Sequence, residues 1–356
     1  MKKPRVVVAM SGGVDSSVAA ALLKKAGYDV TGMFLRTWFD RSIDPKAENR
    51  CCSVESNLLA RQSAAVLGIP FTIVNALVPF REYVVDYFLA ELQAGRTPNP
   101  CIPCNRVVRF QYLLAEAKKL GADYLATGHY LRLQPAGRTI HVWRGRDRQK
   151  DQSYFQYTLT QAKLRRLLFP LGSYTKSQVR KLAAKYGLPS ASREESQDLC
   201  FIPKGKYERF LLKYLVFQPG EIVTTDQRVV GRHKGLPLYT IGQRSGLEIG
   251  GHGPYYVVSK DVKKNRLIVA RADEESRYQK DFYLTKTNFI SGQPPRLPYG
   301  CHVQTRYRQK AQAAVFARRG SQYHVVLKKS TVGLTPGQSA VLYHGDELIG
   351  GGIIRG

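Results

Sequence analysis

The N-terminal part of the chain alternates between two hydrophobic patterns. Short apolar runs, such as 5–10 and 71–76, are separated by longer segments in which apolar side chains recur every three or four positions, such as 16–27 and 175–189. The segment 123–133 is expected to be a further strand. Strands that alternate with helices of this length predict an α/β fold with a doubly wound parallel sheet. Ligands bind such sheets at the carboxyl ends of the strands.

The pattern changes after about residue 215. Short alternating runs, such as 266–271 and 323–329, lie between Gly- and Pro-rich turns. This pattern favours one or two all-β modules, with linkers near 204–216 and 275–290. Cys301 falls in one of the predicted strands, so we expect it to be a small core residue.

The charge balance narrows the class of protein. The chain has 356 residues, with 55 Lys and Arg against 27 Asp and Glu and a formal net charge of +28. Such an excess favours a polyanionic partner, most often nucleic acid; a generally basic proteome or a halotolerant surface is the alternative. No apolar run approaches the ~20 residues of a membrane span. Residues 1–10 are typical of a first strand and not of a signal peptide, so we expect a cytoplasmic protein without a membrane partner.

A Gly-rich turn, SGGVDSS at 11–17, joins the first strand to the first helix. Gly12 and Gly13 let backbone N–H groups approach phosphate oxygens, the serine hydroxyls are further donors, and the helix N-terminus carries partial positive charge. Asp15 would repel phosphate unless Mg²⁺ lay between them. The Gly-Lys-Ser/Thr ending of a Walker A loop is missing, which argues against a kinase or GTPase. A plain helix N-cap is the alternative.

This strand–loop–helix unit resembles that of the PP-loop ATP pyrophosphatases. Members of that family cleave ATP between its α and β phosphates, leave AMP on an acceptor oxygen and release pyrophosphate. The resemblance therefore implies ATP as the bound nucleotide. Because family members act on many acceptors, the loop alone does not identify the substrate.

Seven further motifs occur in order along the chain. They are TPNPCIPCN (97–105), TGHY (127–130), KDQSYF (150–155), SQDLCFIP (196–203), TIGQR (240–244), RYR (306–308) and PGQSAVLY (336–343). With them the chain resembles the tRNA-specific 2-thiouridylases over essentially its whole length. The resemblance implies a transferase that thiolates C2 of the wobble uridine in tRNAs for lysine, glutamate and glutamine. It also implies a PP-loop catalytic domain over 1–204, a central tRNA-binding domain over 205–280 and a β-barrel over 281–356.

The same resemblance assigns roles to individual residues. Attaching AMP to uridine O2 makes that oxygen a good leaving group. Cys200 matches the residue that accepts sulfur as a persulfide from a carrier protein, and Cys104 matches the nucleophile that attacks C2 or resolves the persulfide as a disulfide with Cys200. The implied ATP contacts are Ala9, Met10, Ser11, Gly12, Gly13, Val14, Asp15, Ser16, Leu35 and Gly128. The implied tRNA contacts are Asn99, Pro100, Cys101, His129, Lys150, Asp151, Gln152, Arg306, Tyr307 and Gln338.

Cys101 departs from the family pattern, because many members have Asp at this position. If Cys101, Cys104 and Cys200 converge, three thiolates leave one iron of a [4Fe–4S] cluster open to bind inorganic sulfide. The sequence leaves the persulfide and cluster mechanisms open. A structural zinc needs a fourth ligand, such as Cys51, Cys52 or a histidine. For Cys51 and Cys52, buried thiols at a helix start are the simpler interpretation.

Two basic segments are the candidates for RNA contacts. Together, 132–150 and 304–319 carry eleven Lys or Arg against one acid, Asp147. The aromatic side chains nearby would stack on unpaired bases. These are Tyr154, Phe155, Tyr157 and Tyr307. The alternative for any single arginine is a solvated surface, and reaching a base atom also requires the nucleotide to be extruded.

Two other functions remain open. Another PP-loop enzyme, such as a cytidine thiolase or a lysidine synthetase, would share the ATP chemistry but not the target base; the PGQSAVLY motif argues for the thiouridylase. A non-catalytic RNA-binding protein with a vestigial nucleotide fold is the alternative of a different class. The intact SGGVDSS loop, with Cys104 and Cys200 both present, argues against it.

Overall fold

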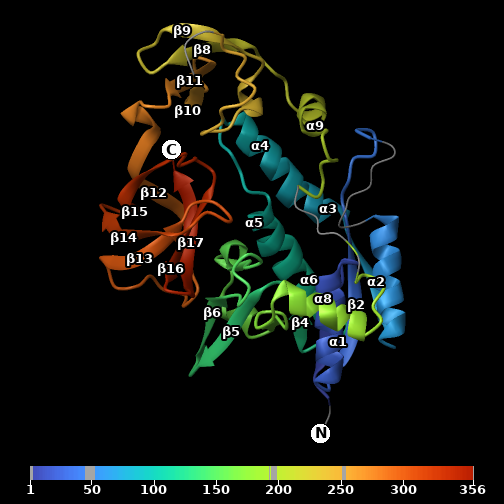
Figure 1. Ribbon diagram of the computed structural model, residues 1–356. Helices are drawn as coiled ribbons and strands as arrows, with labels where there is room; N and C mark the ends of the chain where they lie inside the picture. The colour runs from blue at the N-terminus through green and yellow to red at the C-terminus, as the bar shows by residue number, and fades with distance from the viewer. Residues whose placement is uncertain (1–2, 45–52, 192, 194–198, 251–253, 356) are drawn as a thin grey trace.

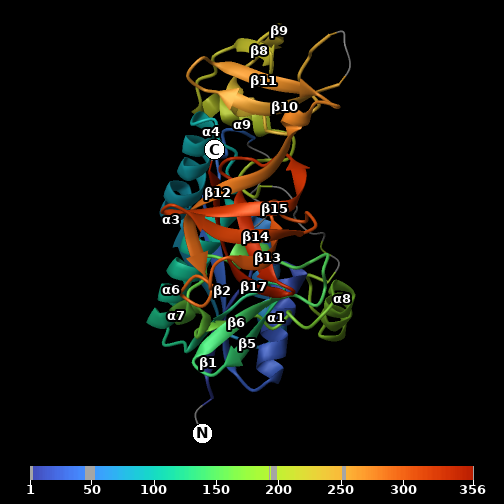
Figure 2. The ribbon, with the colours of Figure 1, turned by 90° about the vertical axis from the view of Figure 1, so that its left-hand side faces the viewer.

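The computed structural model describes residues 3–44, 53–191, 193, 199–250 and 254–355 (Figure 1). A β-barrel lies beside the α/β region that contains the parallel sheet (Figure 1), and a small four-stranded sheet lies at the opposite end of the molecule from the parallel sheet (Figure 2). None of the helices in the described part of the chain is long and apolar enough to cross a membrane. The predicted α/β region and the two all-β modules are confirmed.

Five strands form the parallel sheet, β1 (Arg5–Ala9), β2 (Asp29–Thr37), β3 (Phe71–Ala76), β4 (Tyr124–Ala126) and β7 (Leu167–Leu168). Their order is β3-β2-β1-β4-β7, so the chain first builds outward on one side of β1 and then returns to its other side. Val6 and Val8 of β1 belong to the core on one face, whereas Val7 belongs to the core on the other. This alternation is the two-residue period of a strand covered on both faces.

Helices cover both faces of this sheet. One core contains residues of α1 (Val14–Lys25), α2 (Val54–Val66) and α8 (Lys176–Lys185). The opposite core contains residues of the π-helical segment η2 (Cys104–Tyr112) and of α6 (Leu113–Lys119). The α/β region also contains the helical segments α3 (Leu77–Phe80), η1 (Arg81–Asp86), α4 (Tyr87–Gln93), α5 (Cys101–Pro103), η3 (Ser153–Gln156) and α7 (Gln161–Leu164).

The predicted single strand over 123–133 is wrong, because this segment contributes to two different sheets. β4 ends at Ala126, and β5 (Leu131–Ala136) forms a hairpin with β6 (Thr139–Arg144). β6 then pairs with β17 (Glu347–Arg355) of the barrel. The chain passes between the sheets at Gly128, where an added Cβ would lie 2.9 Å from the backbone of Asp15. This close approach leaves no room for a side chain at position 128, and the apolar pattern does not encode the contact.

The central sheet contains β8 (Gly220–Thr224), β9 (Val229–His233), β10 (Tyr255–Asp261) and β11 (Arg266–Arg271), in the order β10-β11-β8-β9. Two short turns of 3₁₀-helix accompany it, η4 (Leu236–Leu238) and η5 (Glu275–Arg277). The linker predicted near 204–216 is instead largely the helix α9 (Tyr207–Tyr214). Phe210 and Leu211 of α9 are buried in the same core as Phe80 and Phe88 of the α/β region. The apolar face of α9 therefore packs against the α/β region, and the segment is not an exposed linker.

The barrel contains β12 (Tyr278–Phe289), β13 (Tyr299–Gln304), β14 (Gln312–Arg319), β15 (Gln322–Val332), β16 (Ser339–His344) and β17. These six antiparallel strands close because β12 pairs with both β15 and β17. β12 occupies most of the region in which the second linker was predicted, so that prediction is also wrong. Cys301 is buried in the barrel core, as expected, and burial raises its pKa to about 12. The domain boundaries at 204 and 280 stay predictions.

Candidate active site

The SGGVDSS loop lies at the carboxyl end of the central strand. β1 pairs with β2 on one side and with β4 on the other, so the loop lies between the end of β2, which holds Leu35, and the turn after β4, which holds Gly128. The chain order reverses between β1 and β4, which is where parallel sheets of this kind bind ligands. The structure therefore brings the predicted ATP residues, from Ala9 to Ser16 and including Leu35 and Gly128, to one edge of the sheet.

Two features require glycine at position 12, its backbone angle and one close contact. Its φ is +71°, and an added Cβ would lie 2.1 Å from the carbonyl oxygen of Ser56 in α2. Gly13 is the N-cap of α1, and within the described residues no side chain caps this helix. The Ser16 and Ser17 hydroxyls donate to the Gly13 carbonyl at 3.1 and 3.2 Å. These hydroxyls, predicted as phosphate donors, therefore stabilise the loop in this structure.

The Asp15 carboxylate is held by two residues that the sequence interpretation did not identify. Lys176 Nζ lies 2.7 Å from both Asp15 oxygens, and the Tyr130 hydroxyl donates to Asp15 Oδ1 at 2.6 Å. Lys176 is the first residue of α8, which begins with a capping box of Thr175 and Gln178. The capping box predicts from the sequence that a helix begins here, but it does not predict which residue the Lys176 side chain contacts. Both Asp15 oxygens contact Lys176 in this structure, and the Mg²⁺ expectation stays a prediction.

The cysteine motif forms a turn that starts a helix. The Cys101 amide donates to Asn99 Oδ1 at 3.1 Å, and the Cys104 amide donates to the Pro100 carbonyl at 3.2 Å. Asn105 Nδ2 donates to the Cys101 carbonyl at 2.8 Å. Cys101 and Cys104 are therefore separated by about one turn along α5 and the start of η2. Both are half-buried, whereas Pro100 is buried.

Cys200 and Cys104 pack against the same hydrophobic core, which contains Phe80, Val108 and Phe201. Among the described residues, no three His, Cys, Asp or Glu side chains form a group that could hold a metal ion. The described residues therefore form no site for a single metal ion, and the ligand sets named for a cluster and for a zinc ion stay predictions. Cys51 and Cys52 lie outside the described residues.

Two of the predicted tRNA residues in 150–152 hold the local fold. Asp151 is buried and pairs with Arg144 Nη1 at 2.8 Å, and it accepts the Gly145 and Ser153 amides. Gln152 Oε1 accepts the Tyr130 amide at 3.1 Å. Lys150 is half-buried. A role of these residues in tRNA binding stays a prediction.

His129 is buried between aromatic rings. Its Nδ1 lies 2.7 Å from the Thr127 hydroxyl, and its ring contacts those of Phe110 and Phe169. Burial, with a smaller effect of Arg109, lowers the pKa of His129 to about 3. In this structure the side chain is neutral and covered, and its contact with tRNA stays a prediction.

The predicted stacking residues fall into two classes. Tyr154 and Tyr157 are buried at 0% and 1% exposure, so they cannot stack on an RNA base in this structure. Their hydroxyls instead contact Ser339 of β16, at 2.8 Å from its carbonyl and 3.1 Å from its Oγ. Phe155 and Tyr307 are half-buried, with ring centroids 4.4 Å apart.

Arg306 and Gln338, both predicted to contact tRNA, join parts of the chain that are distant in sequence. Arg306 is exposed, but its Nη2 donates to the carbonyls of Ile241 and Gly333 at 2.9 and 3.1 Å. Gln338 Nε2 donates to the Thr97 carbonyl at 3.0 Å. Each side chain therefore has a structural contact in addition to any role toward RNA.

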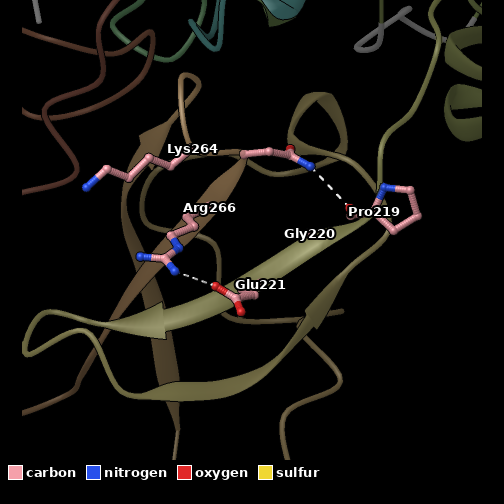
Figure 3. Close-up of a pocket in the computed structure, with 6 residues that line it drawn as sticks. Pro219, Gly220, Glu221, Lys264 and Arg266 are labelled. Carbon is pink, nitrogen blue, oxygen red and sulfur yellow. Dashed lines mark hydrogen bonds and ion pairs between the residues drawn. The ribbon is translucent and has the colours of Figure 1, made fainter.

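A hollow on the central sheet is separate from these residues (Figure 3). It is lined by Pro219, Gly220, Glu221, Lys264, Asn265 and Arg266. Arg266 pairs with Glu221 at 2.8 Å, and Asn265 donates to the Pro219 carbonyl at 3.1 Å. None of the predicted site residues lines it, so it does not compete with the sheet edge as the candidate site.

Family models match three successive segments of the chain. They are described as a tRNA methyl transferase HUP domain over residues 4–204, a tRNA methyl transferase PRC-barrel domain over 208–271 and an aminomethyltransferase beta-barrel domain over 279–354. A solved structure of NMN synthetase from Francisella tularensis covers 57% of this chain and 69% of its own, with a TM-score of 0.36 and 19% identity, a likeness too distant to bear on function.

Curated relatives match over the full length. The tRNA-specific 2-thiouridylase MnmA of Chloroflexus aggregans is 46% identical over 356 residues, covering 98% of each chain. That of Carboxydothermus hydrogenoformans is 44% identical over 365 residues, covering 99% of this chain and 98% of the relative. The chain therefore belongs to the tRNA-specific 2-thiouridylase family.

Proposed function

We propose that this protein is a sulfurtransferase that uses ATP to replace O2 of a tRNA wobble uridine with sulfur. The observation that carries the proposal is the meeting of two elements in one α/β region. The nucleotide loop lies at the carboxyl edge of the sheet, and Cys104 and Cys200 border one hydrophobic core of the same region. The target base and the RNA are inferred from the relatives that match over the full length, which are named tRNA-specific 2-thiouridylases.

The first chemical step activates the base. Uridine O2 attacks the α-phosphorus of ATP, the bond to the β-phosphate oxygen breaks, and pyrophosphate leaves. The backbone from Ala9 to Ser16 would hold the phosphates at the N-terminus of α1. Lys176 pairs at 2.7 Å with Asp15, which lies in the first turn of α1. We assign Lys176 the role of offsetting the charge that develops on the departing pyrophosphate.

The second step transfers sulfur. Cys200 carries a persulfide from a donor protein, and its terminal sulfur attacks C2 while AMP leaves. The Cys104 thiolate then attacks the inner sulfur, which leaves the outer sulfur on C2 and a disulfide between Cys104 and Cys200. An external thiol must reduce that disulfide before the next turnover. We propose this persulfide route because Cys104 and Cys200 pack against one hydrophobic core and are the two thiols that the covalent steps need.

The tRNA, which by family resemblance is that for lysine, glutamate or glutamine, would bind in the cytoplasm through exposed basic side chains. Arg146, Arg148, Arg308 and Lys310 are exposed in the two basic segments. Asn99 to Cys101 would approach the target base. Binding through phosphates and recognition of an extruded base are then carried by separate parts of the chain.

Single-turnover assays with labelled ATP test the two steps separately. Cys104→Ser and Cys200→Ser should accumulate AMP-bound tRNA without 2-thiouridine, whereas Cys301→Ser in the barrel core should behave like the wild type once folding is verified. A tRNA transcript with cytidine at the wobble position should not be modified. Modification of that transcript, with none of the uridine form, would replace the proposal with a cytidine thiolase.

Iron-stripped protein separates the persulfide route from the cluster route. With a persulfide donor, iron-stripped wild type and Cys101→Asp should both form 2-thiouridine, because Cys104 and Cys200 suffice for the covalent steps. Activity that requires iron reconstitution, accepts inorganic sulfide and disappears in Cys101→Ala would establish the cluster route instead.

A further inference from the structure

A turn of the barrel contacts the chain immediately before the cysteine motif. The Thr97 amide donates to the Pro336 carbonyl at 3.0 Å. Gln338 Nε2 donates to the carbonyls of Thr97 and Pro98, at 3.0 and 3.4 Å. Three hydrogen bonds therefore join the turn before β16 to two consecutive residues at the start of the motif.

Gly337 makes this contact close. It is buried with φ at +92°, and an added Cβ would lie 3.0 Å from Arg96 Cβ and 3.1 Å from the Thr97 carbonyl oxygen. A side chain at this position would push the turn away from the Thr97 backbone. The turn itself is fixed to β17, because the Gly337 amide donates to the Ile354 carbonyl and the Ile354 amide donates to the Gln338 carbonyl.

The restraint continues from Thr97 to the cysteines. Asn99 accepts the amides of both Cys101 and Ile102, and the next hydrogen bonds lead into the first turn of η2, where Cys104 lies. Ile102, between the two cysteines, is buried in the core that also contains Val341 and Tyr343 of β16. The barrel thus holds the motif at its start and again at its middle.

We propose that Gly337 and Gln338 are positioning residues, through which the barrel fixes the placement of Cys104 in the absence of tRNA. The inference rests on the proposed function only for the role of Cys104 in sulfur transfer. The hydrogen bonds between Pro336 and Gln338 of the barrel and Thr97 and Pro98, called the clamp below, are a property of the free protein. It assigns the barrel a part in the sulfur step beyond an RNA-binding surface.

Two pairs of variants isolate the clamp. Gly337→Ala is compared with Gly345→Ala, because Gly345 also has a positive φ of +55° but among the described residues no atom lies within 4 Å of its added Cβ. Gln338→Glu keeps the size of the side chain and removes the donor, and it is compared with Gln322→Glu at an exposed position of β15. The second pair keeps the test valid if Gly337→Ala fails to fold.

The readouts use the full-length protein without tRNA or ATP. Amide exchange over 97–104 and the alkylation rate of Cys104, resolved by mass spectrometry, should both rise roughly three- to tenfold in Gly337→Ala and Gln338→Glu, because one or more hydrogen bonds are lost. Both should be unchanged in the two controls. With tRNA, the kcat of sulfur insertion should fall while the KM for tRNA changes less than about twofold.

Two results would overturn the inference. Equal exchange and alkylation in Gly337→Ala and Gly345→Ala would mean that only backbone strain was changed. Unchanged exchange in Gln338→Glu with a raised KM for tRNA would make Gln338 a tRNA contact alone. If the wild type fails to thiolate tRNA, the proposed function fails, but the exchange and alkylation results still decide whether the barrel holds the cysteine motif.

Discussion

At the scale of single residues, the contact between Lys176 and Asp15 gives a direct test of the nucleotide step. Lys176→Met removes the ammonium group and leaves a partly buried carboxylate at the start of α1, where nucleotide phosphates would bind. We expect ATP-dependent pyrophosphate release to fall at least about tenfold, while tRNA still binds, because one preorganised cation is typically worth that much or more. Pyrophosphate release and a tRNA gel shift measure the two properties.

Lys181→Met, on an exposed position of the same helix, is the control for that substitution. The double variant Asp15→Asn with Lys176→Met should recover part of any lost stability, because no unpaired charge then remains. Pyrophosphate release by Lys176→Met that equals that of Lys181→Met would contradict the assigned role.

The buried imidazole of His129 gives a pH dependence with a defined sign. Burial lowers its pKa to about 3, so between that value and the ordinary 6.5 the unfolded chain binds the proton and the folded chain does not. Stability should therefore fall as the pH drops below about 6.5, by roughly 2 kcal/mol at pH 5 from this group alone. Urea unfolding at pH 7 and pH 5 measures it.

His129→Phe removes the titrating group while keeping an aromatic ring beside Phe110 and Phe169. The free energy of unfolding of this variant should depend less on pH over this range than that of the wild type. It should be lower than the wild-type value at pH 7, because the contact with Thr127 is lost. The same acid sensitivity in both proteins would show that His129 is not buried in solution. tRNA binding by this variant tests the predicted RNA contact separately.

At the scale of elements, the phosphate loop was predictable because its signals are local. A strand, a glycine turn and a largely apolar helix follow one another within a short stretch, and each forms where its own residues place it. The two linkers were not predictable in the same way. α9 and β12 are fixed by the burial of Phe210 in the α/β region and by the pairing of β12 with β17, and both partners are distant in sequence.

Glycine 12 tests the loop as an element. Gly12→Ala combines a positive φ with a contact of 2.1 Å to the Ser56 carbonyl, whereas Gly27→Ala has a φ of +89° and, among the described residues, no atom within 4 Å of the added Cβ. Both should lose about 1–2 kcal/mol from the backbone conformation. Only Gly12→Ala should also separate the loop from α2 and lose pyrophosphate release.

Urea unfolding and pyrophosphate assays on the same two variants measure these effects. Pyrophosphate release that survives in Gly12→Ala, at a stability equal to that of Gly27→Ala, would show that the loop does not depend on its close approach to Ser56.

At the scale of the whole molecule, the charge excess indicated a polyanion but did not show which arginines face it. Arg144, counted among the RNA contacts in the sequence, pairs with buried Asp151 and lies 3.6 Å over the Tyr343 ring, so it joins the β6 hairpin to the barrel. A count of basic residues does not distinguish an arginine that makes such a structural contact from one that is exposed to solvent. Its acidic partner lies seven residues further along the chain, and its aromatic partner lies in a distant strand.

The exposed basic residues that remain should make tRNA binding strongly dependent on salt. If 6–10 phosphates are contacted, affinity should fall roughly 10³–10⁵-fold between 50 and 200 mM salt. Arg308→Gln with Lys310→Gln removes two exposed charges from the barrel segment 304–319, and the slope of log affinity against log salt should decrease by up to about two. Lys118→Gln with Lys185→Gln removes two exposed charges outside both basic segments and should leave the slope unchanged. Filter binding across a salt series measures both. Equal slopes for the two double variants would mean that the barrel segment does not contact the tRNA backbone, and a slope near zero for the wild type would contradict phosphate binding altogether.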